Sequence, residues 1–297
     1  MVLSALAEGL DLSAAERVFG HRQATITTWL TRAGEHAQIL HERSFCHLHL
    51  PHLQLDELQT RLRSSTQVLW LWLAIAPLSK IIPVLHLSSR TQISAHKVIH
   101  SLRQVLAPGC VPLFTSDGLN LYFYALTAHF GHWLEVGRRG RKVYQWQVAA
   151  GLIYGQVKKT YQRRKLVRVT PVMRLGTSAA LTAALQGLGL TGRLNTAFIE
   201  RLNLTIRHGV AALARRTWAT SQQASQLLAH LQWWRAYSHF VRPHESLRVA
   251  LVQPRERGGK LLAQRYRQRT PAMAAGRTNR RWTAHEVLSY PLPPVSA

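Results

Sequence analysis

The sequence predicts a mixed α/β fold in which a sheet is flanked by helices. Apolar, β-favouring segments alternate with segments whose apolar residues repeat at helical spacing. The hydrophobic content is 46% and includes nine tryptophans, which is typical of a folded protein. A length of 297 residues suits one large domain with an appendage or two.

The first 40 residues are predicted to form a helix-turn-helix unit. Two short helices are expected across a glycine-containing turn, the second over residues 25–32 with Gly34 ending it. In that arrangement Arg22, Thr27 and Thr28 would face DNA. A small helical cap with no partner fits the same pattern equally well, so both interpretations stay open here.

Three strands are expected next. The apolar runs at 53–58, 67–76 and 81–87 are joined by short connections and predict an antiparallel meander. The second run is apolar on both faces, which is typical of a central strand. Pro83 lacks a backbone N–H donor, so the third strand is expected at an edge of the sheet.

A crossover helix and a fourth strand follow the meander. Thr91 is expected to cap the helix, and the strand ends at Asp117, where Gly118 breaks it. A strand after a crossover helix returns parallel to a neighbour. If that neighbour is 53–58, Asp56 and Asp117 lie about 5 Å apart, close enough to share a pair of metal ions. Alternatively, each aspartate only accepts hydrogen bonds from strand-end amides.

The segment 136–174 contains 11 Lys and Arg residues, no acid, and several interleaved aromatics. Strand-like runs at 143–153 and 165–172 predict a small β insertion at about 136–175. Cations beside aromatics suit tracking of a phosphate backbone together with base stacking, although a solvated surface over core aromatics is the alternative. The expected DNA contacts in this segment are Arg138, Arg139, Arg141, Lys142, Lys158 and Lys159.

A long helix is expected from Asn195 to about residue 217, with one apolar stripe. Glu200 lies in its first turn and is isolated from other acids along the chain. It either favours the helix dipole or acts with its basic neighbours, Arg201, Arg207 and His208, which would bind phosphates beside a metal. A core helix is expected over 222–240. The basic tail that follows, 251–297, forms either a DNA-contacting arm or solvent-exposed surface.

The charge balance favours a polyanionic partner. The chain has 38 Lys and Arg against 13 Asp and Glu, a net charge of +25, and only three aspartates. Nucleic acid is the favoured partner because phosphate neutralisation supplies most non-specific affinity. A membrane is disfavoured, since the longest apolar run, 68–76, is too short to span a bilayer. Two cysteines suggest no disulfide framework, so we expect a cytoplasmic, nucleoid-associated protein.

Several segments together resemble one enzyme family. QLDEL at 54–58, TSDG at 115–118 and NTAFIERLNLTIRH at 195–208 resemble the acidic triad of DDE transposases with a ribonuclease-H-like core. The third segment is similar to insertion-sequence transposases of the insertion-sequence-one group and to related integrase-like enzymes. The stretches 237–247 and 269–276 resemble the segments that close such proteins.

The resemblance implies a ribonuclease-H-like core with a mixed five-stranded sheet. It implies that Asp56, Asp117 and Glu200 are catalytic and together bind two Mg²⁺ or Mn²⁺ ions. The domains expected from it are a helix-turn-helix domain at 1–40, a catalytic domain at 41–250 carrying the basic insertion, and a basic tail at 251–297.

The activity that the resemblance implies is cleavage at the ends of an insertion sequence and strand transfer into target DNA. The expected partner is double-stranded DNA, both the element's inverted repeats and the target, bound by a homodimer or larger assembly. The family's zinc module upstream of the helix-turn-helix has no counterpart here, so a truncated transposase is one alternative. A nuclease or resolvase of the same fold and a catalytically inactive DNA-binding protein are the others.

Overall fold

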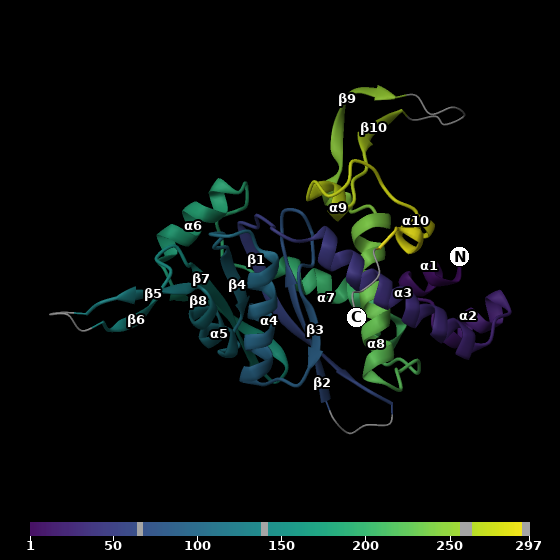
Figure 1. Ribbon diagram of the computed structural model, residues 1–297, viewed down its shortest axis with the longest axis horizontal. Coiled ribbons are helices and arrows are strands. Elements are labelled where there is room, and N and C mark those ends of the chain that lie inside the picture. The colour runs from purple at the N-terminus through teal and green to yellow at the C-terminus, as the bar shows by residue number, and fades with distance from the viewer. Residues whose placement is uncertain (64–67, 138–141, 256–262, 293–297) are drawn as a thin grey trace.

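The computed structural model describes residues 1–63, 68–137, 142–255 and 263–292, and it shows a mixed α/β protein around a six-stranded sheet (Figure 1). The strands of this sheet are β1 (His52–Arg61), β2 (Val68–Ile75), β3 (Leu85–Ser88), β4 (Leu113–Asp117), β7 (Tyr154–Gln162) and β8 (Lys165–Leu175). Their order is β3-β2-β1-β4-β7-β8. β1, β4 and β7 are parallel, β2 is antiparallel to both of its neighbours, and β8 is antiparallel to β7.

Helices flank this sheet and the N-terminal helices pack beside it (Figure 1). The helices in the first half are α1 (Val2–Ala7), α2 (Leu12–Phe19), α3 (Gln23–Ser44), α4 (Gln92–Val105) and α5 (Leu121–His129). Those in the second half are α6 (Ser178–Gly187), α7 (Ala197–Gly209), η1 (Ala211–Leu213), α8 (Ala224–Ala236), η2 (Tyr237–Val241) and η3 (Glu245–Leu247). Among the described residues, none of these helices is long and apolar enough to cross a membrane.

The predicted meander and crossover are confirmed. β1, β2 and β3 pair antiparallel in succession, and Pro83 precedes the edge strand β3. Thr91 caps α4, its hydroxyl accepting a hydrogen bond from the Ser94 N–H, and α4 leads into β4. β4 lies parallel to β1 with Leu55 opposite Ser116. The next residue on each strand is an aspartate, so Asp56 and Asp117 lie side by side, as expected.

The segment predicted as one β insertion at 136–175 is divided between two sheets. β5 (Gly131–Glu135) and β6 (Tyr144–Val148) form a hairpin that projects from the body (Figure 1). β7 and β8 instead complete the main sheet, which therefore has six strands rather than the five expected. Only the first four residues of β7 are buried, and its basic outer half extends into solvent, so the strand's short apolar part is hard to recognise.

The expected end of a helix at Gly34 is wrong, because α3 continues to Ser44. Gly34 lies where α3 crosses α8, and a Cβ atom there would come within 2.6 Å of the Ala229 Cα. The missing side chain therefore permits a close contact between two helices rather than ending one. Leu6 and Ile26 belong to the same buried cluster as the sheet residues, so α1 and α3 share its core.

Replacing Gly34 with Ala is expected to destabilise the protein by about 1–3 kcal/mol, because the added methyl group must push α3 and α8 apart. The matched control is Gly187→Ala at the end of α6, where a Cβ meets nothing within 4 Å. That variant should be neutral or more stable by up to about 1 kcal/mol. Urea denaturation of both proteins measures the difference, and equal stabilities would contradict the close crossing.

α7 is shorter than expected. It ends at Gly209, where a Cβ would collide with the Trp234 side chain, and η1 follows. The predicted apolar stripe is nevertheless buried, and its members are Ile199, Leu202, Ile206, Val210 and Leu213. The expected core helix is also present as α8 continued by η2, with Trp233 and Trp234 fully enclosed.

The described part of the basic tail is folded. β9 (Val249–Arg255) and β10 (Gln264–Arg267) form a second projecting hairpin (Figure 1). Two short helices, α9 (Pro271–Ala274) and α10 (Ala284–Ser289), bring the chain back to the body. Trp282 stacks on Phe240 and on Tyr290 with ring centroids 4.7 and 5.2 Å away, which fixes this return. The tail is therefore an arm with an anchored end rather than a free extension.

Candidate metal centre

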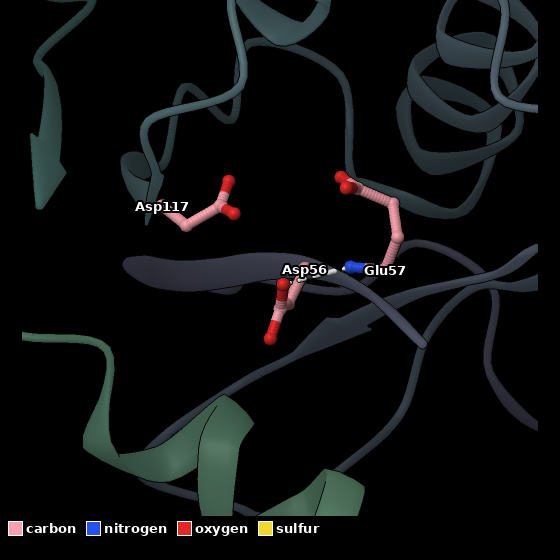
Figure 2. Close-up of side chains that lie close together, drawn as sticks. All are labelled: Asp56, Glu57 and Asp117. Carbon is pink, nitrogen blue, oxygen red and sulfur yellow. Dashed lines mark hydrogen bonds between the residues drawn. The ribbon is translucent and has the colours of Figure 1, made fainter. Parts of the chain in front are cut away.

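Three carboxylates meet where β4 ends beside β1. Asp56 and Glu57 are on β1 and Asp117 is the last residue of β4, and one oxygen of each lies within 4.8 Å of the others. Figure 2 shows the Asp56 and Glu57 carboxyl groups on opposite sides of the strand, with Asp117 beside them. The parallel register brings Asp56 and Asp117 together, as the sequence predicted, and adds Glu57 to them.

Asp56 is held on two sides. Its Oδ1 accepts a hydrogen bond from the Glu57 N–H at 2.9 Å, and its Oδ2 accepts one from Asn203 Nδ2 on α7 at 2.7 Å. Burial, reinforced by the charge of Asp117, raises the pKa of Asp56 to about 7. A cation at this position would therefore relieve the cost of ionising the group.

Glu57 faces α4 and α5, and its side chain is only 1% exposed. Its Oε2 accepts a hydrogen bond from Arg90 Nη2 at 3.0 Å, and the Arg90 guanidinium lies 4.5 Å from the Trp70 ring centroid. Burial raises the pKa of Glu57 to about 7; the neighbouring Tyr122 hydroxyl opposes this rise, and the negative charges of Asp117 and Asp56 add to it. Arg90 thus fixes one oxygen of Glu57.

Polar atoms without partners surround the carboxylates. Glu57 Oε1, the Tyr122 hydroxyl and Asn203 Oδ1 are buried and have no hydrogen-bond partner within the described ranges. Such atoms are uncommon in native proteins and often indicate a missing ion or water. Carboxylate and amide oxygens are the ligands that Mg²⁺ and Mn²⁺ prefer, so the donor set fits either ion.

Glu200, the third acid predicted from the sequence, is adjacent to this group but not a member of it. It lies on α7, one turn before Asn203, and its charge contributes to the raised pKa of Asp56. Its carboxylate accepts a 2.5 Å ion-pair contact from Lys159 Nζ and a hydrogen bond from the Thr196 hydroxyl. These contacts outweigh burial and lower the pKa of Glu200.

The predicted DNA contacts come from several elements. The exposed ones are Arg22 just before α3, Thr28 on α3, Lys142 before β6, Lys158 on β7, and Arg201 and His208 on α7. Those that are half-buried are Thr27, Lys159 and Arg207. Arg138, Arg139 and Arg141 lie outside the described residues. The two elements that border the carboxylates, β7 and α7, therefore carry five of the predicted DNA contacts: Lys158, Lys159, Arg201, Arg207 and His208.

Sequence reasoning missed Glu57. Alternation along a strand sends neighbouring side chains to opposite faces, which argues against Asp56 and Glu57 sharing a site. Glu57 still reaches the group because Asp117 is the last residue of β4. The Asp117 carboxylate is therefore not enclosed on one face of the sheet. The only signal in the sequence was the pair of adjacent acids in a chain that has few.

Replacing Asp56 with Asn is expected to stabilise the metal-free protein at pH 8. The pKa of Asp56 is about 7 in the folded state against an ordinary value of 3.8, so the folded protein holds a proton that the unfolded chain releases. That proton contributes at most about 4 kcal/mol to the free energy of unfolding. The contribution is complete below pH 3.8 and is lost as the pH rises through 7.

Urea denaturation in the presence of a chelator, at pH 5 and pH 8, measures this effect. The gain from Asp56→Asn should shrink by more than half at pH 5, because the wild-type carboxyl is then protonated in the folded state. Asp11→Asn, which retains a helix-capping side chain on α2, is the control for the substitution itself. A gain that does not change with pH would contradict the raised pKa.

No protein-family model matches this chain, and no curated protein matches it.

Proposed function

We propose that the protein is the DNA transposase of an insertion sequence and acts by metal-dependent phosphoryl transfer. One observation carries the proposal: Asp56 and Asp117 lie together on adjacent parallel strands in a chain of net charge +25. Acids clustered at a half-buried position repel one another unless a cation neutralises them. The basic remainder of the chain suits a polyanionic substrate.

The topology supports the finer proposal of a ribonuclease-H-like core. Five neighbouring strands, β3-β2-β1-β4-β7, form a mixed sheet that begins as an antiparallel meander and continues parallel. β8 adds a sixth strand at the edge. For the N-terminal unit we propose DNA binding by α2 and α3, which are joined through Gly20 in the left-handed conformation, with Arg22 and Thr28 exposed beside that turn.

The proposed chemistry assigns a task to each side chain at the site. Asp56 and Asp117 would hold two Mg²⁺ or Mn²⁺ ions, and Asn203 orients the Asp56 carboxylate through its 2.7 Å hydrogen bond. When bound, such ions supply an activated oxygen nucleophile and stabilise the leaving oxygen. By the resemblance, Glu200 is the third catalytic acid.

The cations of β7 and α7 would bind the phosphate backbone next to these acids. Lys158 is exposed and follows the β7 residue that pairs with Asp117, and Arg207 on α7 lies near enough to Asp56 to feel its charge, so these two can take phosphates directly. Contacts of this kind position DNA but carry little sequence information, so recognition of the element's ends falls to other parts of the protein. Two ends must be joined in one reaction, and we therefore propose an assembly of two or more copies on DNA.

A cleavage and joining assay tests the proposal. Purified protein is incubated with Mg²⁺ or Mn²⁺, a labelled duplex carrying the inverted repeats that flank the reading frame, and a target plasmid. A transposase yields cut ends and labelled plasmid. Cleavage without joining would favour a nuclease or resolvase of the same fold, and binding without cleavage would favour a DNA-binding protein or an inactive transposase.

A further inference from the structure

Three histidines gather where α4 packs against α5, outside the carboxylate cluster. His96 and His100 lie four residues apart on α4, so they project from the same side of the helix, one turn apart. His129 is the last residue of α5, and its ring centroid lies 5.5 Å from the ring centroid of each of the other two. The single histidine of α5 therefore faces the pair on α4.

The distance between two of the ring nitrogens matches coordination of one ion. His96 Nδ1 and His129 Nε2 are 3.4 Å apart. Hydrogen bonds in proteins typically span about 2.7–3.2 Å between donor and acceptor, so this contact is long for one. Two zinc–nitrogen bonds of about 2.0–2.1 Å at a tetrahedral angle place their nitrogens about 3.3–3.4 Å apart. The two rings are thus already spaced as ligands of a single metal ion.

His100 is placed to supply a third ligand. The three ring nitrogens do not yet lie within 4.8 Å of one another, because the carboxylate cluster is the one group of three ligands within that limit among the described residues. The His100 side chain is exposed, and its Nε2 makes a 3.5 Å contact with Gln104 Nε2, which is too long to hold the ring firmly. Exposed side chains change rotamer rapidly, so rotation of His100 can bring a nitrogen to the ion beside His129.

The two helices hold the histidines at a fixed separation. Gln92, the first residue of α4, donates a hydrogen bond from Nε2 to the Leu121 carbonyl oxygen at the start of α5, at 3.1 Å. Val98 of α4 and Leu126 of α5 are buried in the same hydrophobic core. Ligands carried by packed helices are positioned more precisely than ligands on loops.

The donor set determines the class of ion. Imidazole nitrogen suits Zn²⁺, Cu²⁺ and Ni²⁺, whereas Mg²⁺ and Mn²⁺ prefer the oxygen ligands of the carboxylate cluster. Three histidines also leave the fourth position of a tetrahedral zinc ion open to water. The two groups of side chains therefore select different ions.

We propose that His96, His100 and His129 bind a divalent transition-metal ion of the Zn²⁺ class, which ties α4 to α5. These helices immediately precede and follow β4, so the ion braces the strand that ends at Asp117. The site goes beyond the proposed function and does not depend on it, because its ligands belong to neither the carboxylate cluster nor the predicted DNA contacts.

Titration of the full chain with Zn²⁺ against a chromophoric chelator, at pH 8 and after removal of bound metal, tests the site. His96→Gln, His100→Gln and His129→Gln should each weaken Zn²⁺ binding by at least about tenfold, since disturbing even the groups that orient a metal ligand costs that much. The matched control is His49→Gln, which removes an exposed histidine from the segment before β1 and should leave binding unchanged.

Carboxylates also accept Zn²⁺, so the titration is repeated with Asp117→Asn. The histidine site predicts that this variant keeps the Zn²⁺ binding that His129→Gln loses. If Asp117→Asn abolishes Zn²⁺ binding and His129→Gln does not weaken it, the ion belongs to the carboxylates. The histidine site is then overturned, whereas the proposed function stands.

Thermal unfolding provides a second measurement. Zn²⁺ at about 100 times its dissociation constant should raise the melting temperature of the wild type by about 4 °C, and His100→Gln should at least halve that rise. Because His100 is exposed, its substitution should leave the metal-free protein as stable as the wild type. An undiminished rise in His100→Gln, or an equal loss in His49→Gln, would overturn the proposal.

Discussion

Replacing Asp117 with Asn is expected to reduce DNA cleavage and joining by about 10³-fold or more. The side chain keeps its size but loses the charge that holds a divalent ion at the end of β4. Folding should not suffer, because the substitution also removes repulsion with the buried Asp56 carboxylate. The measurement is the rate of product formation from labelled element ends in Mg²⁺, with urea denaturation as the check on folding.

The chain provides a matched control for this substitution. Asp11 is the one aspartate outside the cluster, and its Oδ1 accepts a hydrogen bond from the Ala14 N–H at 2.8 Å to cap α2. Asparagine caps helices about as well as aspartate, so Asp11→Asn should leave activity unchanged. Undiminished activity in Asp117→Asn would remove the assignment of this site, whatever the control shows.

Affinity for duplex DNA is expected to fall by about 10³- to 10⁵-fold between 50 and 200 mM salt, if six to ten phosphates are contacted. The excess of 38 basic over 13 acidic residues makes counterion release the main source of this affinity. Fluorescence anisotropy with a labelled duplex of unrelated sequence measures it. A flat dependence over this range would contradict the proposed DNA surface.

Single variants localise that surface. Lys158→Gln should weaken binding of all sequences alike and reduce the slope of log affinity against log salt by about 1. The comparison is Lys97→Gln, which also removes an exposed lysine, but from α4. That helix begins on the Glu57 side of β1, away from α7. If Lys97→Gln changes the slope as much as Lys158→Gln, the cations of β7 are not the DNA contacts proposed.

Much of the sheet was predictable because its signals are local. The continuous apolar run of β2, the Thr91 cap of α4 and the handedness of crossovers together predicted that Asp56 and Asp117 would be neighbours. The role of Gly34 was not predictable, because it depends on Ala229 of a helix far away in the chain. Nor was β7, whose four buried residues are too few to stand out beside the basic half of the strand.

The candidate site was predictable to the same degree. Two aspartates follow from strand register, whereas the contribution of Glu57 depends on where β4 ends in space. The ion pair of Lys159 with Glu200 was missed because the sequence assigned Lys159 to an insertion outside the sheet. Once β7 lies beside β4, Lys159 faces α7, and the pairing follows from topology rather than from local pattern.

The C-terminal hairpin leaves and rejoins the body at one place. Where the β9–β10 ribbon begins and ends, the His244 N–H donates a hydrogen bond to the Arg269 carbonyl oxygen, and the Trp282 N–H donates one to the Phe240 carbonyl oxygen. Both ends of the ribbon are thus anchored to the body. Because both ends are anchored, the exposed Arg265 and Arg267 of β10 are held near the body, whereas on a free tail they could reach farther along a bound duplex.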